Sequence, residues 1–356
     1  MVGLSYPVTV AEGAFDHLAD VIQSVAAHAN RIAVITDSEV GPRYADRAKK
    51  QLGARAAVFT IPSGEQHKTR DTWARLTDEM LANGFARDSI VVALGGGVVG
   101  DIAGFVAATY MRGVPVIQVP TSLLAMVDAS VGGKTGVDTP EGKNLVGAFH
   151  QPSAVVIDPL VLRTLPPEHL RAGFAEIVKH GVVADATYFE RASSFVEQWP
   201  LSGQQGLPEL TDIIARSVEI KAAIVARDER ESGLRKVLNF GHTIGHAIEA
   251  ATEFGTLHGQ AVAIGLVAEA KLAEKIGVAK TGTARVIERV CRAAGLQTKM
   301  PSIPVDTIIG FTRSDKKVRA GRVEYALPKQ IGEMAGADHG WTIPVEDTVV
   351  REALGS

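Results

Sequence analysis

The first half of the chain alternates short apolar runs with helical patterns. Apolar runs rich in β-branched residues occupy positions 31–37, 54–61, 89–94 and 114–119. Between them, residues 72–82 repeat apolar side chains at the three- and four-residue spacing of one helix face. Strands that alternate with helices favour a parallel sheet that is covered on both faces. The pattern therefore predicts a Rossmann-like α/β domain over residues 1–165.

The second half of the chain has a different character. Long, alanine-rich helical patterns occupy positions 168–184, 210–227, 243–251, 259–276 and 282–294. The one strand signal is a short run at 323–327, and prolines cluster around 159–167, where the character changes. We therefore predict an all-α domain over residues 166–356. The active site is expected in the cleft between the two domains.

The composition excludes several classes of protein. The formal net charge is −3, so no basic excess indicates nucleic acid as a partner. The single cysteine, Cys291, excludes a disulfide framework and a thiolate zinc site, and it is typical of a reducing compartment. The first residues lack the charged head and apolar run of a signal peptide, and polar residues and glycines interrupt the apolar region 90–127. We expect a cytoplasmic protein that does not cross a membrane.

A glycine turn follows one of the predicted strands. Residues 95–97 are all glycine, and they lead into a helical pattern that contains Asp101 in its first turn. Such a junction lets a pyrophosphate approach the N–H groups at the start of a helix. The spacing differs from the G-x-G-x-x-G fingerprint, so a purely structural turn also fits. Asp37 and the polar loop 63–68 are expected at the same sheet edge, where Asp37 would accept a hydrogen bond from a ribose hydroxyl.

Two lysines are expected in glycine-rich loops. Lys134 follows two glycines, and Lys143 stands between a glycine and Asn144. The segment before Lys134 lacks the first glycine of a phosphate-binding P-loop, which argues against a Walker-type NTPase. Lysines in loops are often only solvated. Beside a nucleotide site, however, they indicate a grip on phosphate or another oxyanion.

Three histidines and one glutamate form the candidate metal constellation. His242 and His246 are four residues apart and share a helix face, His258 follows them, and Glu176 lies upstream. Two histidines and one carboxylate suit a catalytic zinc with an open fourth position. The spacing leaves open which histidine is spare, and a histidine on an alanine-rich helix is more often a core residue.

The same half of the chain contains further cations, namely Lys179, Lys221, Arg235, Lys316 and Lys317. Each of them alone would be a solvated surface charge. Gathered around a metal, they predict a pocket for an anionic substrate that is phosphorylated or carboxylated.

Longer motifs run in order along nearly the whole chain. They are 63–68 (SGEQHK), 95–101 (GGGVVGD), 111–113 (MRG), 119–124 (VPTSLL), 131–136 (VGGKTG), 142–149 (GKNLVGAF), 175–179 (AEIVK), 228–235 (DERESGLR), 239–249 (NFGHTIGHAIE), 257–259 (LHG) and 315–317 (DKK). With these motifs the chain resembles the 3-dehydroquinate synthase family of the sugar phosphate cyclase superfamily.

The resemblance implies a role for each matching residue. It implies a zinc site, with cobalt as an alternative metal, formed by Glu176, His242 and His258, and it leaves His246 as the histidine that does not bind the metal. It implies an NAD site made by Asp37, Glu65, Lys68, Gly96, Gly97, Val98, Val99, Gly100, Asp101, Thr121, Ser122, Lys134 and Lys143. It implies that a phosphorylated sugar-acid substrate contacts Arg112, Asp128, Lys134, Lys143, Asn144, Lys179, Lys221, Arg235, Asn239, His246 and Lys316 or Lys317.

The resemblance also implies a reaction of the shikimate pathway. The substrate 3-deoxy-D-arabino-heptulosonate 7-phosphate would become 3-dehydroquinate and phosphate through transient oxidation by NAD, phosphate elimination, reduction and aldol ring closure. The enzyme would then be a carbon–oxygen lyase, and a homodimer is expected. Three alternatives remain: a sister cyclase of the aminodehydroquinate or 2-deoxy-scyllo-inosose synthase type, a metal-dependent glycerol or alcohol dehydrogenase, and a non-catalytic NAD-binding protein.

Overall fold

The computed structural model describes residues 6–199, 207–253, 255–314, 318–319 and 322–355. These residues form two compact units, one within Gly3–Leu165 and the other within Pro166–Ser356. They are referred to below as the N-terminal unit and the C-terminal unit. Lys316 and Lys317, one of which is expected at the substrate site, lie outside the described residues.

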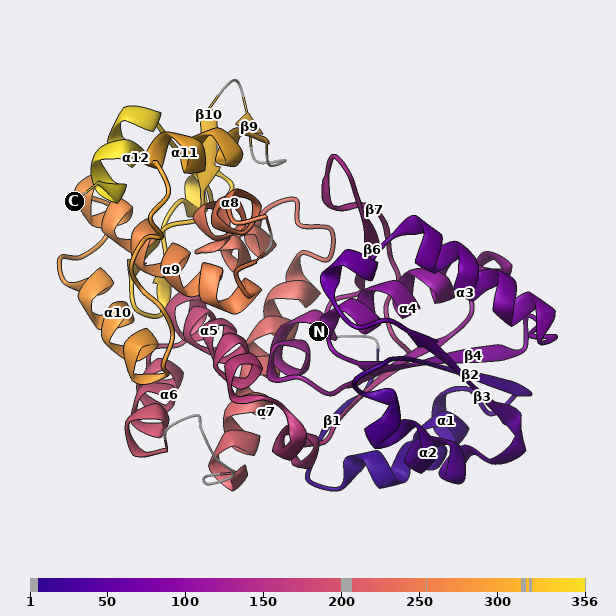
Figure 1. Ribbon diagram of the computed structural model, residues 1–356. Coiled ribbons are helices and arrows are strands. Elements are labelled where there is room, and N and C mark those ends of the chain that lie inside the picture. The colour runs from indigo at the N-terminus through magenta and orange to yellow at the C-terminus, as the bar shows by residue number, and fades with distance from the viewer. Residues whose placement is uncertain (1–5, 200–206, 254, 315–317, 320–321, 356) are drawn as a thin grey trace. The chain divides into compact units, whose positions relative to one another are not determined.

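The N-terminal unit is built on a parallel sheet (Figure 1). In sheet order, its strands are β1 (Val8–Val10), β8 (Ala154–Ile157), β5 (Val116–Pro120), β4 (Ser89–Gly95), β2 (Arg31–Asp37) and β3 (Ala56–Ile61). Every residue of β4 is buried, as expected for a strand that is covered on both faces. The apolar runs correctly predict β2 to β5, whereas β1 and β8 at one edge of the sheet fall outside those runs.

Helices cover both faces of this sheet. They are α1 (Leu18–Val25), α2 (Gly41–Leu52), α3 (Arg70–Ala82) and α4 (Gly97–Thr109). Figure 1 shows α1 and α2 on one face and α3 and α4 on the other. Ile35 and Val91 of the sheet belong to one buried cluster with Leu76 of α3 and Ile102 of α4. The predicted α/β class with a sheet covered on both sides is therefore confirmed.

The two lysine-bearing segments form a β-hairpin, so the prediction of glycine-rich loops is wrong. Strand β6 (Lys134–Thr139) pairs antiparallel with β7 (Gly142–Phe149), and Gly136 lies opposite Gly147. A Cβ atom on Gly136 would stand 2.7 Å from the carbonyl oxygen of residue 146, and one on Gly147 would stand 2.1 Å from that of residue 135. These glycines therefore serve the close approach of two strands and do not open a loop.

The C-terminal unit is mostly helical, as predicted (Figure 1). Its helices are α5 (Pro167–Ala184), α6 (Ala186–Gln198), α7 (Leu207–Arg227), α8 (His242–Ala251), α9 (His258–Lys275), α10 (Thr283–Ala293), α11 (Val305–Ser314) and α12 (Asp347–Leu354). Within the described parts of the chain, none of the helices combines the length and the apolar character that a membrane span requires.

Two small sheets accompany these helices. One contains β13 (Ile343–Val345), β10 (Arg322–Tyr325) and β9 (Val318–Arg319), and the other contains β11 (Pro328–Gln330) and β12 (Glu333–Met334). The expected all-α domain is therefore corrected to a mostly helical one. Strands this short give no alternating pattern, and for this reason the sequence indicated only the run that contains β10.

One buried cluster joins the last part of the C-terminal unit. It contains Ile244 of α8, Ile264 and Leu272 of α9, Ile308 of α11 and Tyr325 of β10. Full burial of one such apolar side chain contributes roughly 1.5–3 kcal/mol. The packing of α8 against α9 is therefore strongly determined by the core, and these are the helices that carry the candidate histidines.

Candidate functional site

Three helices of the C-terminal unit bring two histidines and a glutamate together. Glu176 lies in the middle of α5, and His242 and His258 are the first residues of α8 and α9. The carboxylate of Glu176 is fully buried, and its Oε1 atom is 3.5 Å from Nε2 of His242 and 3.6 Å from Nε2 of His258. One ligand atom of each residue lies within 4.8 Å of those of the other two, so the three could hold a metal ion.

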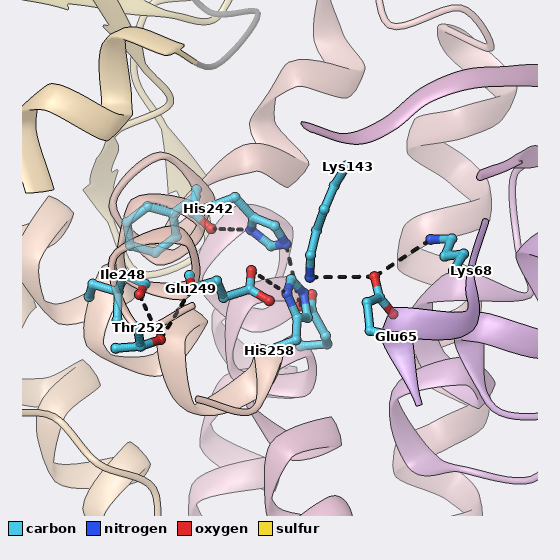
Figure 2. Close-up of polar contacts among 10 residues, drawn as sticks. Glu65, Lys68, Lys143, His242, Ile248, Glu249, Thr252 and His258 are labelled. Carbon is cyan, nitrogen blue, oxygen red and sulfur yellow. Dashed lines mark hydrogen bonds and ion pairs between the residues drawn. The ribbon is translucent and has the colours of Figure 1, made fainter. Parts of the chain in front are cut away.

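The other ring nitrogen of each histidine is held by an oxygen atom. Nδ1 of His242 donates to the carbonyl oxygen of Phe240 at 3.1 Å, and Nδ1 of His258 donates to Oε2 of Glu249 at 3.1 Å (Figure 2). A carbonyl or carboxylate oxygen only accepts, so Nδ1 carries the proton in both rings. Nε2 of each ring therefore faces Glu176, and it would offer its lone pair to a metal when the ring is neutral. This outer arrangement is typical of histidines that bind a metal.

The electrostatics of the group favour a positive charge beside Glu176. Burial alone would lower the pKa of His258, but attraction to Glu249 and hydrogen bonds to Glu176 and Glu249 outweigh it and raise the pKa to about 10. Burial, together with the charge of Lys179, lowers the pKa of His242 despite the attraction of Glu176. The two carboxylates therefore attract a cation to this point, and either a proton or a metal ion meets that requirement.

His246 lies beside the same group on α8. Its ring centroid is 5.3 Å from that of His242 and 5.9 Å from that of His258. His246, Glu249 and His258 also have ligand atoms within 4.8 Å of one another. In this second group, however, Glu249 already accepts the proton of His258 Nδ1. The Nδ1 hydrogen bonds therefore favour Glu176, His242 and His258 as the metal-binding set.

Several of the predicted cations are buried in the C-terminal unit. Lys179 is 1% exposed and forms an ion pair with the Glu176 carboxylate. Lys221 and Arg235 are also buried. The Arg235 guanidinium donates to the carbonyl oxygen of Glu229. Asn239, another predicted contact of the substrate, donates from its amide nitrogen to the Glu231 carboxylate.

The glycine turn lies at the carboxyl end of β4 in the N-terminal unit. Gly96 is the N-cap residue of α4, and no side chain caps this helix. No side chain therefore accepts the first backbone N–H groups of α4, as in helix starts that bind phosphate. A Cβ atom on Gly96 would stand 3.5 Å from Oγ of Ser122. Thr121 follows β5 and donates its backbone N–H to the Gly95 carbonyl at 2.9 Å, which ties these two strand ends together.

The first turn of α4 contains the remaining glycine-turn residues. Val98, Val99 and Gly100 precede Asp101 there. A Cβ atom on Gly100 would stand 2.9 Å from Oε1 of Gln118, whose Nε2 atom donates to the Gly100 carbonyl at 3.1 Å. Gly100 therefore serves the packing of α4 on β5, a purpose that sequence analysis did not assign to it.

A charged network lies beside this turn. Nζ of Lys68 is 2.6 Å from Oδ2 of Asp101. Oε1 of Glu65 is 3.9 Å from Nζ of Lys68 and 3.4 Å from Nζ of Lys143 (Figure 2). Burial alone would lower the pKa of Lys68, but Asp101, Glu65 and Asp138 outweigh it, so this pKa lies above its ordinary value. Burial in turn raises the pKa of Asp138. Lys68, Asp101, Glu65 and Lys143 belong to the sequence motifs, whereas no motif contains Asp138.

Two further predicted residues, Asp37 and Asn144, belong to strands β2 and β7. Asp37 ends β2, and its Oδ1 atom accepts the N–H groups of Glu39 and Val40, both at 2.8 Å. One carboxylate oxygen therefore shapes the loop before α2, which sequence analysis did not assign to it. The N–H of Asn144 donates to Oδ1 of Asp138 at 2.8 Å across the hairpin.

Three further predicted residues lie in the N-terminal unit. Lys134 is exposed at the start of β6. Arg112 has a left-handed backbone, with φ at 69°, and Met111 before it has φ at 50°. Two adjacent side-chain-bearing residues in this region carry backbone strain, which is often found at functional sites. Asp128 lies in a short π-helical turn at Ala125–Ala129. Turns of this kind are also frequent at functional sites.

Comparison with known proteins defines the class. A 2-deoxy-scyllo-inosose synthase, solved with carbaglucose-6-phosphate, NAD+ and Co2+, is 26% identical, has a TM-score of 0.86 and covers 98% of this chain and 95% of its own. A 2-epi-5-epi-valiolone synthase from Streptomyces hygroscopicus, with NAD+ and Zn2+ bound, is 28% identical, with a TM-score of 0.86 and coverage of 98% and 96%. The fold is therefore that of the sugar phosphate cyclases.

Sequence relatives identify the family within this class. Residues 58–172 match the 3-dehydroquinate synthase N-terminal family model, and residues 173–318 match the C-terminal one. A 3-dehydroquinate synthase from Synechococcus sp. is 45% identical over 342 residues, which cover 94% of this chain and 92% of the relative. One from Symbiobacterium thermophilum is 44% identical over 335 residues, which cover 92% of each. The chain belongs to the 3-dehydroquinate synthase family, which confirms the resemblance inferred from the motifs.

Proposed function

We propose that this protein converts 3-deoxy-D-arabino-heptulosonate 7-phosphate into 3-dehydroquinate and phosphate, as a carbon–oxygen lyase. The observation that carries the proposal is the Glu176, His242 and His258 group, found in a chain that matches both halves of the 3-dehydroquinate synthase family. This group suits a metal that binds hydroxyl oxygens, and the reaction begins at a hydroxyl.

The donor set fits a zinc ion, with cobalt as an alternative. Two neutral imidazoles and one carboxylate are the protein ligands of many catalytic zinc sites. The protons on both Nδ1 atoms support the fit, because they direct Nε2 of His242 and His258 toward Glu176. A bound zinc would act as a Lewis acid and lower the pKa of a substrate hydroxyl. His246 would remain outside the ligand set, where its imidazole exchanges a proton with the substrate.

The edge of the sheet in the N-terminal unit fits NAD. The helix start at Gly96 and Gly97 offers N–H groups to the pyrophosphate, and Val98, Val99 and Gly100 form the turn beneath it. The proposed polar contacts are Asp37, Glu65, Lys68, Asp101, Thr121, Ser122, Lys134 and Lys143. When bound, NAD would take a hydride from the substrate and later return it. A charged Lys68 held by Asp101 keeps this edge ordered before the nucleotide binds.

Lysine and arginine side chains, together with three polar residues, would contact the substrate, and the cations would hold its anionic ends. The proposed contacts are Arg112, Asp128, Lys134, Lys143, Asn144, Lys179, Lys221, Arg235 and Asn239, together with Lys316 or Lys317. Lysine and arginine form strong charge-assisted hydrogen bonds with phosphate and carboxylate. Burial of Lys179, Lys221 and Arg235 strengthens such contacts, because they form away from bulk water.

The family relationship supports this reaction over that of a simple alcohol dehydrogenase. A dehydrogenase releases NADH, whereas the proposed enzyme regenerates NAD in every turnover. A sister cyclase would share the cofactors and differ in its substrate. We also propose that the protein is a cytoplasmic homodimer. The single cysteine supports a reducing compartment, and the family supports the dimer.

The test is phosphate release from the proposed substrate by protein first stripped of metal and then supplied with zinc and catalytic NAD+. The expected result is stoichiometric phosphate without accumulation of NADH. Glu176→Gln should lose both bound zinc and turnover, because it removes the ligand charge at nearly constant side-chain volume. Steady NADH production with simple alcohols, or an absence of phosphate from protein loaded with both cofactors, would contradict the proposal.

A further inference from the structure

A second fully buried carboxylate lies on the helix that begins at His258. Glu269 of α9 has 0% of its surface exposed, and the roles described above do not involve it. Burial of an ionisable group is costly unless hydrogen bonds compensate for the lost water. The bonds that Glu269 makes therefore indicate its purpose.

Both carboxylate oxygens of Glu269 accept backbone N–H groups at the start of α8. Oε2 accepts from Gly241 at 2.7 Å, and Oε1 accepts from Ile244 at 2.9 Å. The residues that donate these bonds flank His242 in the sequence. Gly241, the N-cap residue of α8, has a left-handed backbone and no side chain to cap the helix. Glu269 therefore supplies from a neighbouring helix the cap that α8 lacks.

A glycine brings the two helices close enough for this contact. Gly265 lies one turn before Glu269 on the same face of α9. A Cβ atom on Gly265 would stand 1.9 Å from the carbonyl oxygen of Gly241 and 2.9 Å from the N–H nitrogen of Gly245. The backbone of α9 therefore lies directly against the first turn of α8. Any side chain at residue 265 would separate the two helices and lengthen the bonds of Glu269.

We propose that Glu269 is a positioning residue for the metal site. It ties the backbone around His242 to the helix that carries His258. The distance between the two imidazoles is then set by α9, before any metal binds. The inference rests on the metal site of the proposed function and extends it to a residue that does not touch the metal.

A merely stabilising cap would behave differently, and the chain offers a matched control. Glu274, also on α9, accepts the N–H of Ala284 in the first turn of α10 with its Oε1 atom at 2.7 Å. Glu274→Gln therefore alters a helix cap of the same chemistry that does not hold a candidate ligand. Glu269→Gln keeps the side-chain volume but presents an amide N–H to one of the two backbone donors.

The decisive measurement is zinc affinity by chelator competition, with the absorption spectrum of the cobalt-substituted protein as a second readout. Changes in the surroundings of metal ligands typically weaken binding by 10- to 100-fold. We expect Glu269→Gln to weaken zinc binding by about tenfold and to change the cobalt d–d bands, while Glu274→Gln changes neither. Wild-type affinity and spectrum in folded Glu269→Gln, or equal effects in both variants, would overturn the proposal.

Amide hydrogen exchange of the wild-type protein tests the same idea without a substitution, and it decides the matter if Glu269→Gln does not fold. The amides of Gly241 and Ile244 should exchange slowly in both metal-free and zinc-bound protein, because Glu269 holds them in either state. Fast exchange that slows only after zinc is added would refute the positioning role. If the wild-type protein binds no zinc, the metal site of the proposed function is refuted. Slow exchange of the two amides in that protein would show that the contact of Glu269 with α8 exists and that only the metal site is wrong.

Discussion

Two substitutions of Glu249 distinguish the effect of its negative charge from the effect of its hydrogen bond to His258. Glu249 is 2% exposed, and its Oε2 atom accepts the Nδ1 proton of His258 at 3.1 Å. Glu249→Gln keeps an acceptor oxygen at the same place but removes the charge. Glu249→Leu removes the acceptor as well and leaves the N–H of His258 without its partner.

The expected losses follow from the strengths of these bonds. A hydrogen bond to a charged group contributes about 1.5–3 kcal/mol, and one to a neutral group contributes about 0.5–1.5 kcal/mol. These ranges differ by about 1–1.5 kcal/mol, and about 1.4 kcal/mol corresponds to a factor of ten in binding. We therefore expect zinc affinity to fall about tenfold in Glu249→Gln. In Glu249→Leu it should fall about 100-fold, at the upper end of such substitutions.

The assay is competition between metal-stripped protein and a chromophoric zinc chelator at constant pH. Glu324→Gln serves as the control, because Glu324 on β10 also accepts a hydrogen bond, from Oγ1 of Thr342 at 2.8 Å. This control should bind zinc as the wild-type protein does. Wild-type affinity in Glu249→Gln would refute the argument about charge, and equal losses in both Glu249 variants would refute the argument about the hydrogen bond.

Three further predictions concern other residues. His246→Ala should keep zinc within about twofold of wild-type affinity and lose turnover, whereas His242→Ala should lose the metal; zinc content and phosphate release distinguish the two outcomes. Burial alone would raise the pKa of Asp228, but bonds from the N–H groups of Arg235 and its neighbours outweigh it and lower this pKa. The ionised Asp228 therefore stabilises the folded protein above the unfolded-state pKa of roughly 4, and this contribution is lost as pH falls through the lower folded-state pKa. The free energies of urea unfolding of the wild-type protein and of Asp228→Asn should therefore converge in acid. A difference that stays constant with pH would contradict this. Burial raises the pKa of Cys291 to about 12, so a thiol reagent at neutral pH should modify it only after unfolding, and rapid modification of folded protein would disprove the burial argument.

The sequence predicts the central strands well because their signal is local. The run 90–94 is apolar throughout, which is typical of a strand covered on both faces. The β6–β7 hairpin could not be predicted in the same way. Gly136 and Gly147 face each other across two strands, and that pairing becomes visible only when the register is known. Without the register, the same glycines indicate flexible loops.

The candidate site shows a similar division. The motifs indicate Glu176, His242 and His258 through family resemblance, but Glu249 and Glu269 act by holding other residues. Their importance depends on which helix faces which, and a single sequence does not contain that information directly. A signal nevertheless exists for Glu269, because it is the one charged residue in the otherwise apolar stretch 261–270. A lone carboxylate on a buried helix must have partners.

The positions of His242 and His258 at the first residues of α8 and α9 have an electrical consequence. The amino terminus of a helix carries about half a positive elementary charge. Two such ends, together with the ammonium group of Lys179, roughly offset two of the three negative charges of Glu176, Glu249 and Glu269. A divalent metal would then leave an excess of positive potential around its open position. Ligands that offer ionisable hydroxyl groups should be preferred there, and amines of the same shape, which present an ammonium group, should be repelled.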